Sequence, residues 1–342
     1  MLTSDFDYNL PQELIAQHPI SIRDTSKLMV LNKISGEIQH STFHEITKFL
    51  KKNDLLVFND TKVLQAKIKG YSPNIKKNLE ILLTEKIDSK NWKCLIKNSK
   101  KIPDNSNIKI NLDTKKISVD IKIKQTLSDG SRIIQFFEDI DLNTIGVVPL
   151  PPYIKTNIKN SQRYQTIYAK HDGSIAAPTA GLHFTKEILK KINSIGVNFA
   201  FVTLHIGIGT FRPIYSKDPS KHKMHPERWQ INQLAADKIN TAKQNGHRII
   251  AVGTTTTRLL ENSIDQIGKP LNPGNGLAKN FILPGYNFKV VDGLITNFHL
   301  PKSTLLMMVS AMAGKENIFS AYQNAIKNNY RFYSFGDSML IT

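Results

Sequence analysis

The chain has 342 residues, of which 40% are hydrophobic and 22% charged, and it carries a formal net charge of +18. This length and composition are typical of a soluble globular protein with more than one domain. No apolar run approaches the roughly 20 residues that a transmembrane helix needs. The stretch MLTSDFDYNLP lacks the basic and apolar regions of a signal peptide, and the single Cys94 cannot form an internal disulfide. We therefore expect a soluble, cytoplasmic protein.

The basic charge has two interpretations. A basic surface attracts nucleic acid, so RNA binding is one of them. Only eight of the 46 basic residues are arginine, which leaves 38 lysines, and this excess of lysine also arises from AT-rich coding without any partner. The arginines are the more informative residues, because a planar guanidinium makes bidentate contacts that lysine cannot make.

Residues 1–63 have a mixed α/β pattern. We expect a short helix in LPQELIAQHP, strands at 27–33 and 36–43, a helix at 44–52 and a buried strand at 54–60. Residues 64–152 differ, because five short β-type runs follow one another with no helical pattern between them. The segment SDGSR, 128–132, is a hairpin signal. This part of the chain predicts a small antiparallel β-barrel inserted into the main domain.

The α/β pattern returns after the proline-rich link at 147–154. We expect a helix at 185–196 before a strand at 197–205, and a helix at 233–246 before a strand at 247–253. A further strand at 288–298 leads to a helix capped by Ser303. The predicted fold is therefore α/β: a mostly parallel sheet with helices on both faces, formed by residues 1–63 and 153–342, with the barrel at 64–152 inserted.

Five loops rich in small and polar residues follow strands or precede helices. They are FNDTK at 58–62, AAPTAGLHFT at 176–185, LHIGIGTFRP at 204–213, VGTTTTR at 252–258 and TNFHLPKS at 296–303. Ligands of open α/β sheets bind at the carboxyl ends of the strands, so these loops are the candidate site. The residues that we expect to touch ligand are Thr179, Gly181, Gly207, Gly209, Thr210, Thr255, Thr256, Thr257 and Arg258.

Each loop also has a simpler interpretation. The threonines of VGTTTTR precede a helix, so their amides and hydroxyls, with Arg258, could bind an anion or could only cap the helix. The glycines after His205 could admit a ligand or form a plain turn. His299 could be a buried core histidine. In KHKMHPERW, His225 and Glu227 favour substrate binding over a zinc site, because Pro226 breaks the helix that would align metal ligands and no cysteine lies nearby.

Taken together, the motifs resemble one family, the S-adenosylmethionine:tRNA ribosyltransferase-isomerases of queuosine biosynthesis. The matching stretches include DFDYNLPQELIAQHP, RDTSKLMVLN, DLLVFNDTKV, AAPTAGLHFT, VTLHIGIGTFRP, MHPE, RIIAVGTTTTRLLE, PGYNFKVVDGLITNFHLPKSTLL and RFYSFGDSMLI. They run from residue 5 to 341 and leave out only the β-insert. LAKNFILPGY lacks the threonine and acidic residue expected before Pro-Gly-Tyr, and Phe335 and Ser338 stand where tyrosine and alanine are common.

The resemblance implies an α/β domain with an inserted β-barrel. It also implies a reaction that transfers the ribosyl part of S-adenosylmethionine to 7-aminomethyl-7-deazaguanine at the tRNA wobble position and isomerises it. The products are epoxyqueuosine-tRNA, adenine and methionine. S-adenosylmethionine is then a consumed substrate, and no metal or further cofactor is expected. The chain has no coiled-coil heptads or obvious interface strand, so we expect a monomer.

The reaction assigns hypothetical roles to the loops. Removal of the C5′ proton beside the sulfonium needs a base, for which the candidates are His205, His183 and Asp60. Departing adenine needs an acid, for which they are His299 and Asp337. The methionine carboxylate would bind at Thr255–Thr257 and Arg258.

Three rival classes remain. A non-catalytic basic RNA-binding protein fits the charge alone. A methyltransferase would need a glycine-rich strand–loop–helix, and a phosphoribosyltransferase would need an acidic pair before the threonines; RIIAVG has none.

Overall fold

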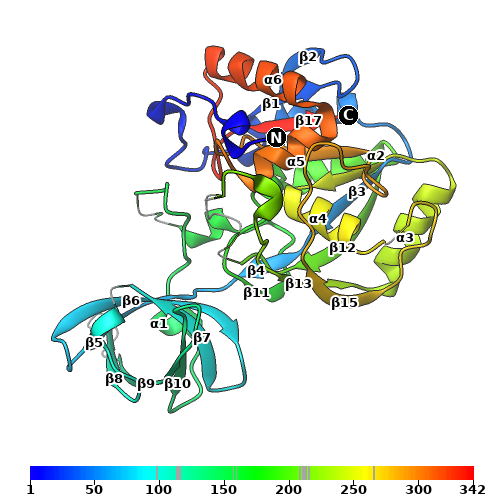
Figure 1. Cartoon of the computed structure of the whole chain (residues 1–342). Coiled ribbons are helices and arrows are strands. Elements are labelled where there is room, and N and C mark those ends of the chain that lie inside the picture. Colours follow the sequence, from blue (N-terminus) through cyan, green and yellow to red (C-terminus); the bar gives the residue numbers. More distant parts are fainter. Residues whose placement is uncertain are drawn as a thin grey trace. The chain divides into compact units, whose positions relative to one another are not determined.

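The chain folds into two compact units. The structure, a computed structural model, describes all residues except 98, 113–116, 157, 159, 208, 210–213, 215 and 265. One unit comprises Met1–Lys62, Pro151–His171 and Ala177–Thr342, and the other comprises Val63–Leu150 and Asp172–Ala176. The first is an α/β unit and the second contains a closed barrel (Figure 1). The predicted fold class, an α/β sheet plus an inserted antiparallel barrel, is therefore confirmed.

The α/β unit is built on a nine-stranded sheet with the order β15-β13-β12-β3-β14-β16-β17-β1-β2. Its strands are β1 (Lys27–Leu31), β2 (Ile38–Thr42), β3 (Leu55–Asn59), β12 (Asn198–Leu204), β13 (Glu227–Ile231), β14 (Ile249–Val252), β15 (Gly274–Ala278), β16 (Gly293–Asn297) and β17 (Ser338–Ile341). The central strands β12, β3, β14 and β16 are mutually parallel. β17 runs antiparallel to β16 and parallel to β1, and β2, β13 and β15 pair antiparallel with their neighbours. The sheet is therefore mixed, with its parallel part at the centre.

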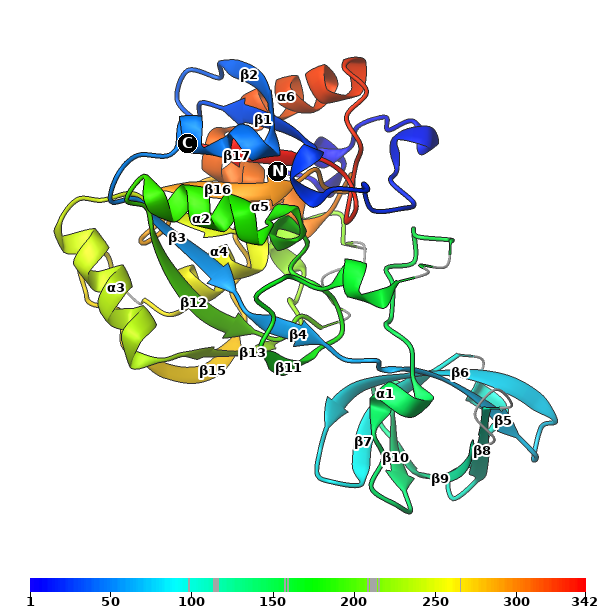
Figure 2. The same cartoon turned by 180° about the vertical axis from the view of Figure 1, so that it is seen from behind.

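The helices of this unit are α2 (Lys186–Ser194), α3 (Gln233–Gln244), α4 (Thr254–Asn262), α5 (Thr304–Ala313) and α6 (Lys315–Lys327). Ile250 and Val252 pack in one core cluster with Ile188 and Ile192 of α2, and Figure 2 shows α2 lying across that face of the sheet. Ile249 and Ala251 are equally buried. Since successive strand residues point to opposite faces, both faces of the sheet are covered.

Local sequence signals explain where the helices begin. Thr185 caps α2 by accepting from the Ile188 amide, and Ser303 caps α5 by accepting from the Leu306 amide, as their sequence context predicts. The two expected N-terminal helices are instead 3₁₀ segments, Gln12–Leu14 and Phe43–Phe49.

The second unit is a closed barrel with the strand order β10-β7-β6-β5-β8-β9. Its elements are β5 (Lys67–Ser72), β6 (Lys77–Lys86), β7 (Asn91–Ile96), β8 (Asn107–Leu112), β9 (Ile117–Thr126), β10 (Arg132–Phe136) and the one-turn helix α1 (Leu142–Ile145). The predicted SDGSR hairpin joins β9 to β10, and Gly130 there has φ +79°, a conformation that favours glycine. β4 (Thr61–Val63) and β11 (His171–Ser174) form a separate two-stranded sheet.

Candidate functional site

The candidate loops meet at one edge of the sheet. The parallel strands β3, β12, β14 and β16 end at Asn59, Leu204, Val252 and Asn297. Their carboxyl ends therefore lie side by side, and the loops after them carry the polar groups that the sequence singles out.

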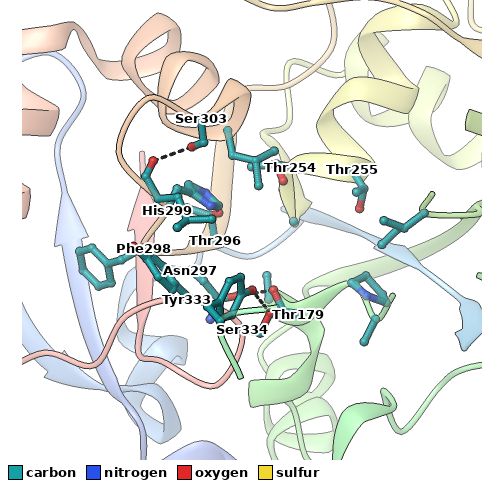
Figure 3. A pocket seen from close by; sticks show the side chains of 18 residues that line it. Thr179, Thr254, Thr255, Thr296, Asn297, Phe298, His299, Ser303, Tyr333 and Ser334 are labelled. Carbon is teal, nitrogen blue, oxygen red and sulfur yellow. Dashed lines mark hydrogen bonds between the residues drawn. The ribbon is translucent and has the colours of Figure 1, made fainter. Parts of the chain in front are cut away.

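A pocket of about 630 Å³, open mouth included, lies at this edge. Its wall combines threonine and serine hydroxyls with aromatic rings, and its lining residues are Tyr153, Ala177, Pro178, Thr179, Ala180, Ile206, Gly253, Thr254, Thr255, Thr296, Asn297, Phe298, His299, Leu300, Ser303, Leu305, Tyr333 and Ser334. Figure 3 shows His299 beside Thr296, with Thr254 and Thr255 from the start of α4.

The structure brings Thr179, Thr255 and His299 to this pocket among the residues predicted for the site. Thr210 lies outside the described residues. The remaining predicted residues do not belong to the described lining: Asp60, Gly181, His183, His205, Gly207, Gly209, His225, Glu227, Thr256, Thr257, Arg258 and Asp337. Most of them lie behind the wall and hold it in place.

His183 is a buried support of the wall. Asn297 Nδ2 donates to its Nε2 at 3.1 Å and also faces the Asp337 carbonyl at 3.4 Å. These contacts make Nε2 the acceptor, so Nδ1 carries the proton and donates to Ser26 Oγ at 2.7 Å. Burial, together with the charges of Arg23 and Arg331, lowers the pKa of His183 to about 3. His183 is therefore neutral and orients Asn297, which lines the pocket.

His299 lines the pocket itself. Its Nε2 lies 2.8 Å from Thr296 Oγ1, and burial lowers its pKa to about 3. The imidazole is thus neutral at physiological pH. It can hydrogen-bond to a ligand but carries no positive charge.

Asp337 is committed to the backbone. One carboxylate oxygen accepts from the Lys27 amide at 2.9 Å and the other from the Arg331 amide at 2.8 Å. Burial raises the pKa of this carboxyl, and the two amides oppose the shift. Asp337 therefore ties β1 to the segment before β17.

His205 and Asp60 lie just beyond the ends of β12 and β3. Thr61 Oγ1 lies 2.8 Å from His205 Nδ1 and fixes the half-buried ring. Asp60 accepts from Thr203 Oγ1 at 2.6 Å, and its other oxygen lies 3.7 Å from His171 Nε2. Asp60 lines a different pocket, of about 730 Å³, together with Tyr168. We call the pocket lined by Thr179, Thr255 and His299 the main pocket. His205 is closer to it than Asp60 is, because the next residue, Ile206, lines it.

The threonine run forms the first turn of α4 and does not precede the helix. The helix is capped by Gly253 and begins at Thr254. The hydroxyls of Thr256 and Thr257 donate to the carbonyls of Val252 and Gly253. These two threonines are therefore occupied by their own backbone, whereas Thr254 and Thr255 reach the pocket.

Arg258 binds an internal carboxylate. Its Nη1 lies 2.6 Å from Glu227 Oε2, and the two side chains are only 3% and 2% exposed. The other oxygen, Oε1, accepts from the Gly207 amide at 2.9 Å. This ion pair thus fixes the loop that follows His205. Gly209 is needed in that loop because a Cβ there would lie 2.6 Å from the side chain of the exposed His225.

Gly181 makes room for a neighbouring side chain of the protein. A Cβ on this residue would lie 2.0 Å from Tyr168 Oη and 2.8 Å from Thr166 Cγ2. The small residue therefore admits Tyr168, and the neighbouring Thr179 and Ala180 line the pocket.

Gly181→Ala is expected to lower the free energy of unfolding by about 1–3 kcal/mol, since overpacking a filled site forces its neighbours to move. Thermal unfolding measures the change. Tyr168→Phe in the same chain removes the nearest clashing atom and should restore part of the loss. If the double variant were as unstable as the sum of the singles, this contact would not be the cause.

Most lining residues were not predicted individually, and four of them that carry polar groups are Tyr153, Asn297, Tyr333 and Ser334. Tyr153 Oη lies 2.6 Å from Ser334 Oγ, and its ring is 4.8 Å from that of Tyr333. Tyr333 has φ +69°, which is uncommon for a residue with a side chain and often marks a functional position. The motif RFYSFGDSM contains two of the four, but no local pattern distinguishes them.

Two kinds of feature are absent from the described residues. These residues contain no group of three or more His, Cys, Asp or Glu that could hold a metal ion. They also contain no helix of the length and apolarity that a bilayer crossing requires.

Comparison with known proteins places these features in context. The family model described as "Queuosine biosynthesis protein" matches residues 3–341. The chain is 48% identical over 346 residues to the S-adenosylmethionine:tRNA ribosyltransferase-isomerase of Caldanaerobacter subterraneus and 48% over 347 residues to that of Clostridioides difficile, covering 100% of each. The crystal structure of S-adenosylmethionine tRNA ribosyltransferase from Thermotoga maritima is 37% identical, with a TM-score of 0.56, over 99% of this chain and 100% of that one.

Proposed function

Because this chain belongs to the queuosine biosynthesis protein family, we propose that it is an S-adenosylmethionine:tRNA ribosyltransferase-isomerase. It transfers the ribosyl moiety of S-adenosylmethionine to 7-aminomethyl-7-deazaguanine at the tRNA wobble position and isomerises it, which gives epoxyqueuosine-tRNA and releases adenine and methionine. The observation that carries the proposal is 48% identity over the full length of relatives with that name. S-adenosylmethionine is consumed, and the reaction uses no metal or cofactor.

The main pocket supplies suitable groups for S-adenosylmethionine. Tyr333, which lines the pocket, offers an aromatic face for the adenine ring or the sulfonium. The backbone amides of Thr254 and Thr255 lie at the N-terminus of α4. A helix N-terminus is a favourable position for a carboxylate. We assign the methionine carboxylate to this helix terminus, because the Arg258 guanidinium is already paired with Glu227.

The proton-transfer roles follow from burial. We assign the general base to His205, which is half-buried, oriented by Thr61 and adjacent to the pocket-lining Ile206. His183 is less suitable because both ring nitrogens are bound inside the protein. His299 faces the departing adenine as a neutral hydrogen-bonding group.

Adenine release tests the function. Purified protein is mixed with S-adenosylmethionine and tRNA that carries 7-aminomethyl-7-deazaguanine, and free adenine and methionine are measured by chromatography. Equal amounts of both, formed only with the modified tRNA and undiminished by EDTA, are expected. Release of S-adenosylhomocysteine would instead indicate a methyltransferase, and tRNA binding with no product would indicate the non-catalytic alternative.

His205→Asn is expected to lower kcat by about 10²–10⁴, the usual contribution of a general base. Its affinity for tRNA should stay within about twofold, because asparagine keeps a polar side chain of similar size at this position. His44→Asn, on an exposed histidine of the Phe43–Phe49 segment, is the matched control and should react at the wild-type rate. Wild-type kcat in His205→Asn would transfer the base role to another group.

We also propose that the protein is a monomer. We place it in the cytoplasm, where its tRNA substrate takes part in translation. Light scattering after size exclusion should give the mass of one chain, and twice that mass would contradict it.

A further inference from the structure

A second, smaller pocket lies beside the main one. Its space is about 280 Å³, open mouth included, and its wall includes Arg23, Arg163, Leu182, His183 and Ser334. Ser334 lines both pockets. A third guanidinium, that of Arg331, contacts the same wall by donating to the Phe335 carbonyl at 2.8 Å. We call this the arginine pocket; Arg23 and Arg163 line it, and Arg331 holds the main chain of its wall.

The three guanidinium groups have no acidic partner in the described part of the chain. Arg23 donates to the carbonyls of Leu182, Gln162 and Gln165 at 2.8–3.0 Å. Arg163 donates to the carbonyls of Ser21 and Ile20, and Arg331 to those of Phe335 and His18. By contrast, Arg248 pairs with Asp54 at 2.5 Å and Arg258 with Glu227 at 2.6 Å. Carbonyl dipoles solvate a positive charge without neutralising it.

The charges also act on one another. Burial lowers the pKa of Arg23, and the nearby charge of Arg163 lowers it further. Burial also lowers the pKa of Arg331, and the charge of Asp337 opposes this shift. The two carboxylate oxygens of Asp337, however, accept hydrogen bonds from main-chain amides. Within the described residues, Arg163 Nε is buried and has no acceptor. Positive charges that lie half-buried near one another, with one N–H group lacking an acceptor, raise the free energy of the folded state unless an anion binds to them.

We propose that the arginine pocket binds a backbone phosphate of the substrate tRNA, next to the nucleotide whose base enters the main pocket. This inference rests on the proposed function. A phosphate matches the fork geometry of guanidinium groups and carries the missing negative charge. The methionine end of S-adenosylmethionine fits less well, because its ammonium and sulfonium would both be repelled by three arginines. The shared residue Ser334 gives the two sites a common wall.

The test couples one protein change to single RNA changes. Arg163→Gln is compared with wild type for binding of full-length tRNA in which single phosphates near the wobble nucleotide are replaced by uncharged methylphosphonate. For wild type, we expect one or two replacements to weaken binding about tenfold. In Arg163→Gln the same replacements should have little effect, and the slope of log K against log salt should fall by about one. Lys190→Gln, on the exposed side of α2, is the matched loss of one charge and should keep the full sensitivity.

Every outcome bears on the proposal. If Arg163 only holds the segment around Ile20 in place, Arg163→Gln should weaken the binding of every tRNA equally. The effects of the substitution and of the methylphosphonates would then be independent, which would overturn the proposal. A raised KM for S-adenosylmethionine with unchanged tRNA affinity would assign the pocket to the methionine carboxylate instead. If Arg163→Gln does not fold, the methylphosphonate series on wild type still decides, since insensitivity at every position contradicts a phosphate site. Failure of the proposed function is separate: wild type would then release no adenine, whatever the coupling.

Discussion

Arg258→Leu should lower the free energy of unfolding of the α/β unit by about 3–5 kcal/mol, the usual cost of leaving one member of a buried ion pair alone. The carboxylate of Glu227, whose side chain is 2% exposed, would lose the Arg258 guanidinium that now pairs with it. It also holds the Gly207 amide at 2.9 Å. The loop that follows His205 would therefore loosen, and kcat should fall by at least tenfold.

Tryptophan fluorescence can isolate this effect. The chain has two tryptophans, so a Trp92→Phe background leaves Trp229, on β13 close to Glu227, as the only reporter during urea unfolding. The control is Arg258→Leu combined with Glu227→Gln, which keeps an oxygen for the Gly207 amide but removes the charge. This double variant should recover at least half of the lost stability. Equal loss in both variants would mean that the packing of Arg258 matters and its charge does not.

The fold was predictable because its signals are local. Short β-type runs indicated most of the strands, Thr185 and Ser303 marked helix starts, and SDGSR marked a hairpin, whereas β13, β15 and β17 were not predicted. The rule that ligands bind at the carboxyl ends of parallel strands then indicated the correct edge of the sheet. The mixed character of the sheet was less visible, because the direction of β17 depends on how the chain returns after α6.

Individual site residues were less predictable, because their surroundings come from distant parts of the chain. Glu227 and Arg258 are 31 residues apart, and Asn297 meets His183 across 114 residues. Neither distance leaves a pattern in the sequence. A reactive histidine and a structural one also look alike in a motif. Only burial separates His183 from the more exposed His205.

Acid should destabilise the α/β unit through its buried histidines. His183 and His299 have pKa values lowered to about 3 by burial, against about 6.5 in an unfolded chain. Below pH 6.5 the unfolded state therefore binds protons that the folded state does not, so stability is complete above pH 6.5 and falls as the pH drops toward 3. At pH 5 the two residues together should cost about 4 kcal/mol, since each pH unit below 6.5 costs about 1.4 kcal/mol per histidine.

Substitution separates the histidines from the carboxylates that titrate at lower pH. His299→Gln removes one titrating group, so the loss of stability between pH 7 and pH 5 should be about 2 kcal/mol smaller than in wild type, measured by urea unfolding with Trp229 as reporter. The comparison is between the two pH values within each protein, so any constant cost of the substitution cancels. His44→Gln, on an exposed histidine, should leave the acid-induced loss unchanged. The same loss in His299→Gln as in wild type would mean that His299 is protonated in the folded protein, and it could then serve as a true acid toward adenine.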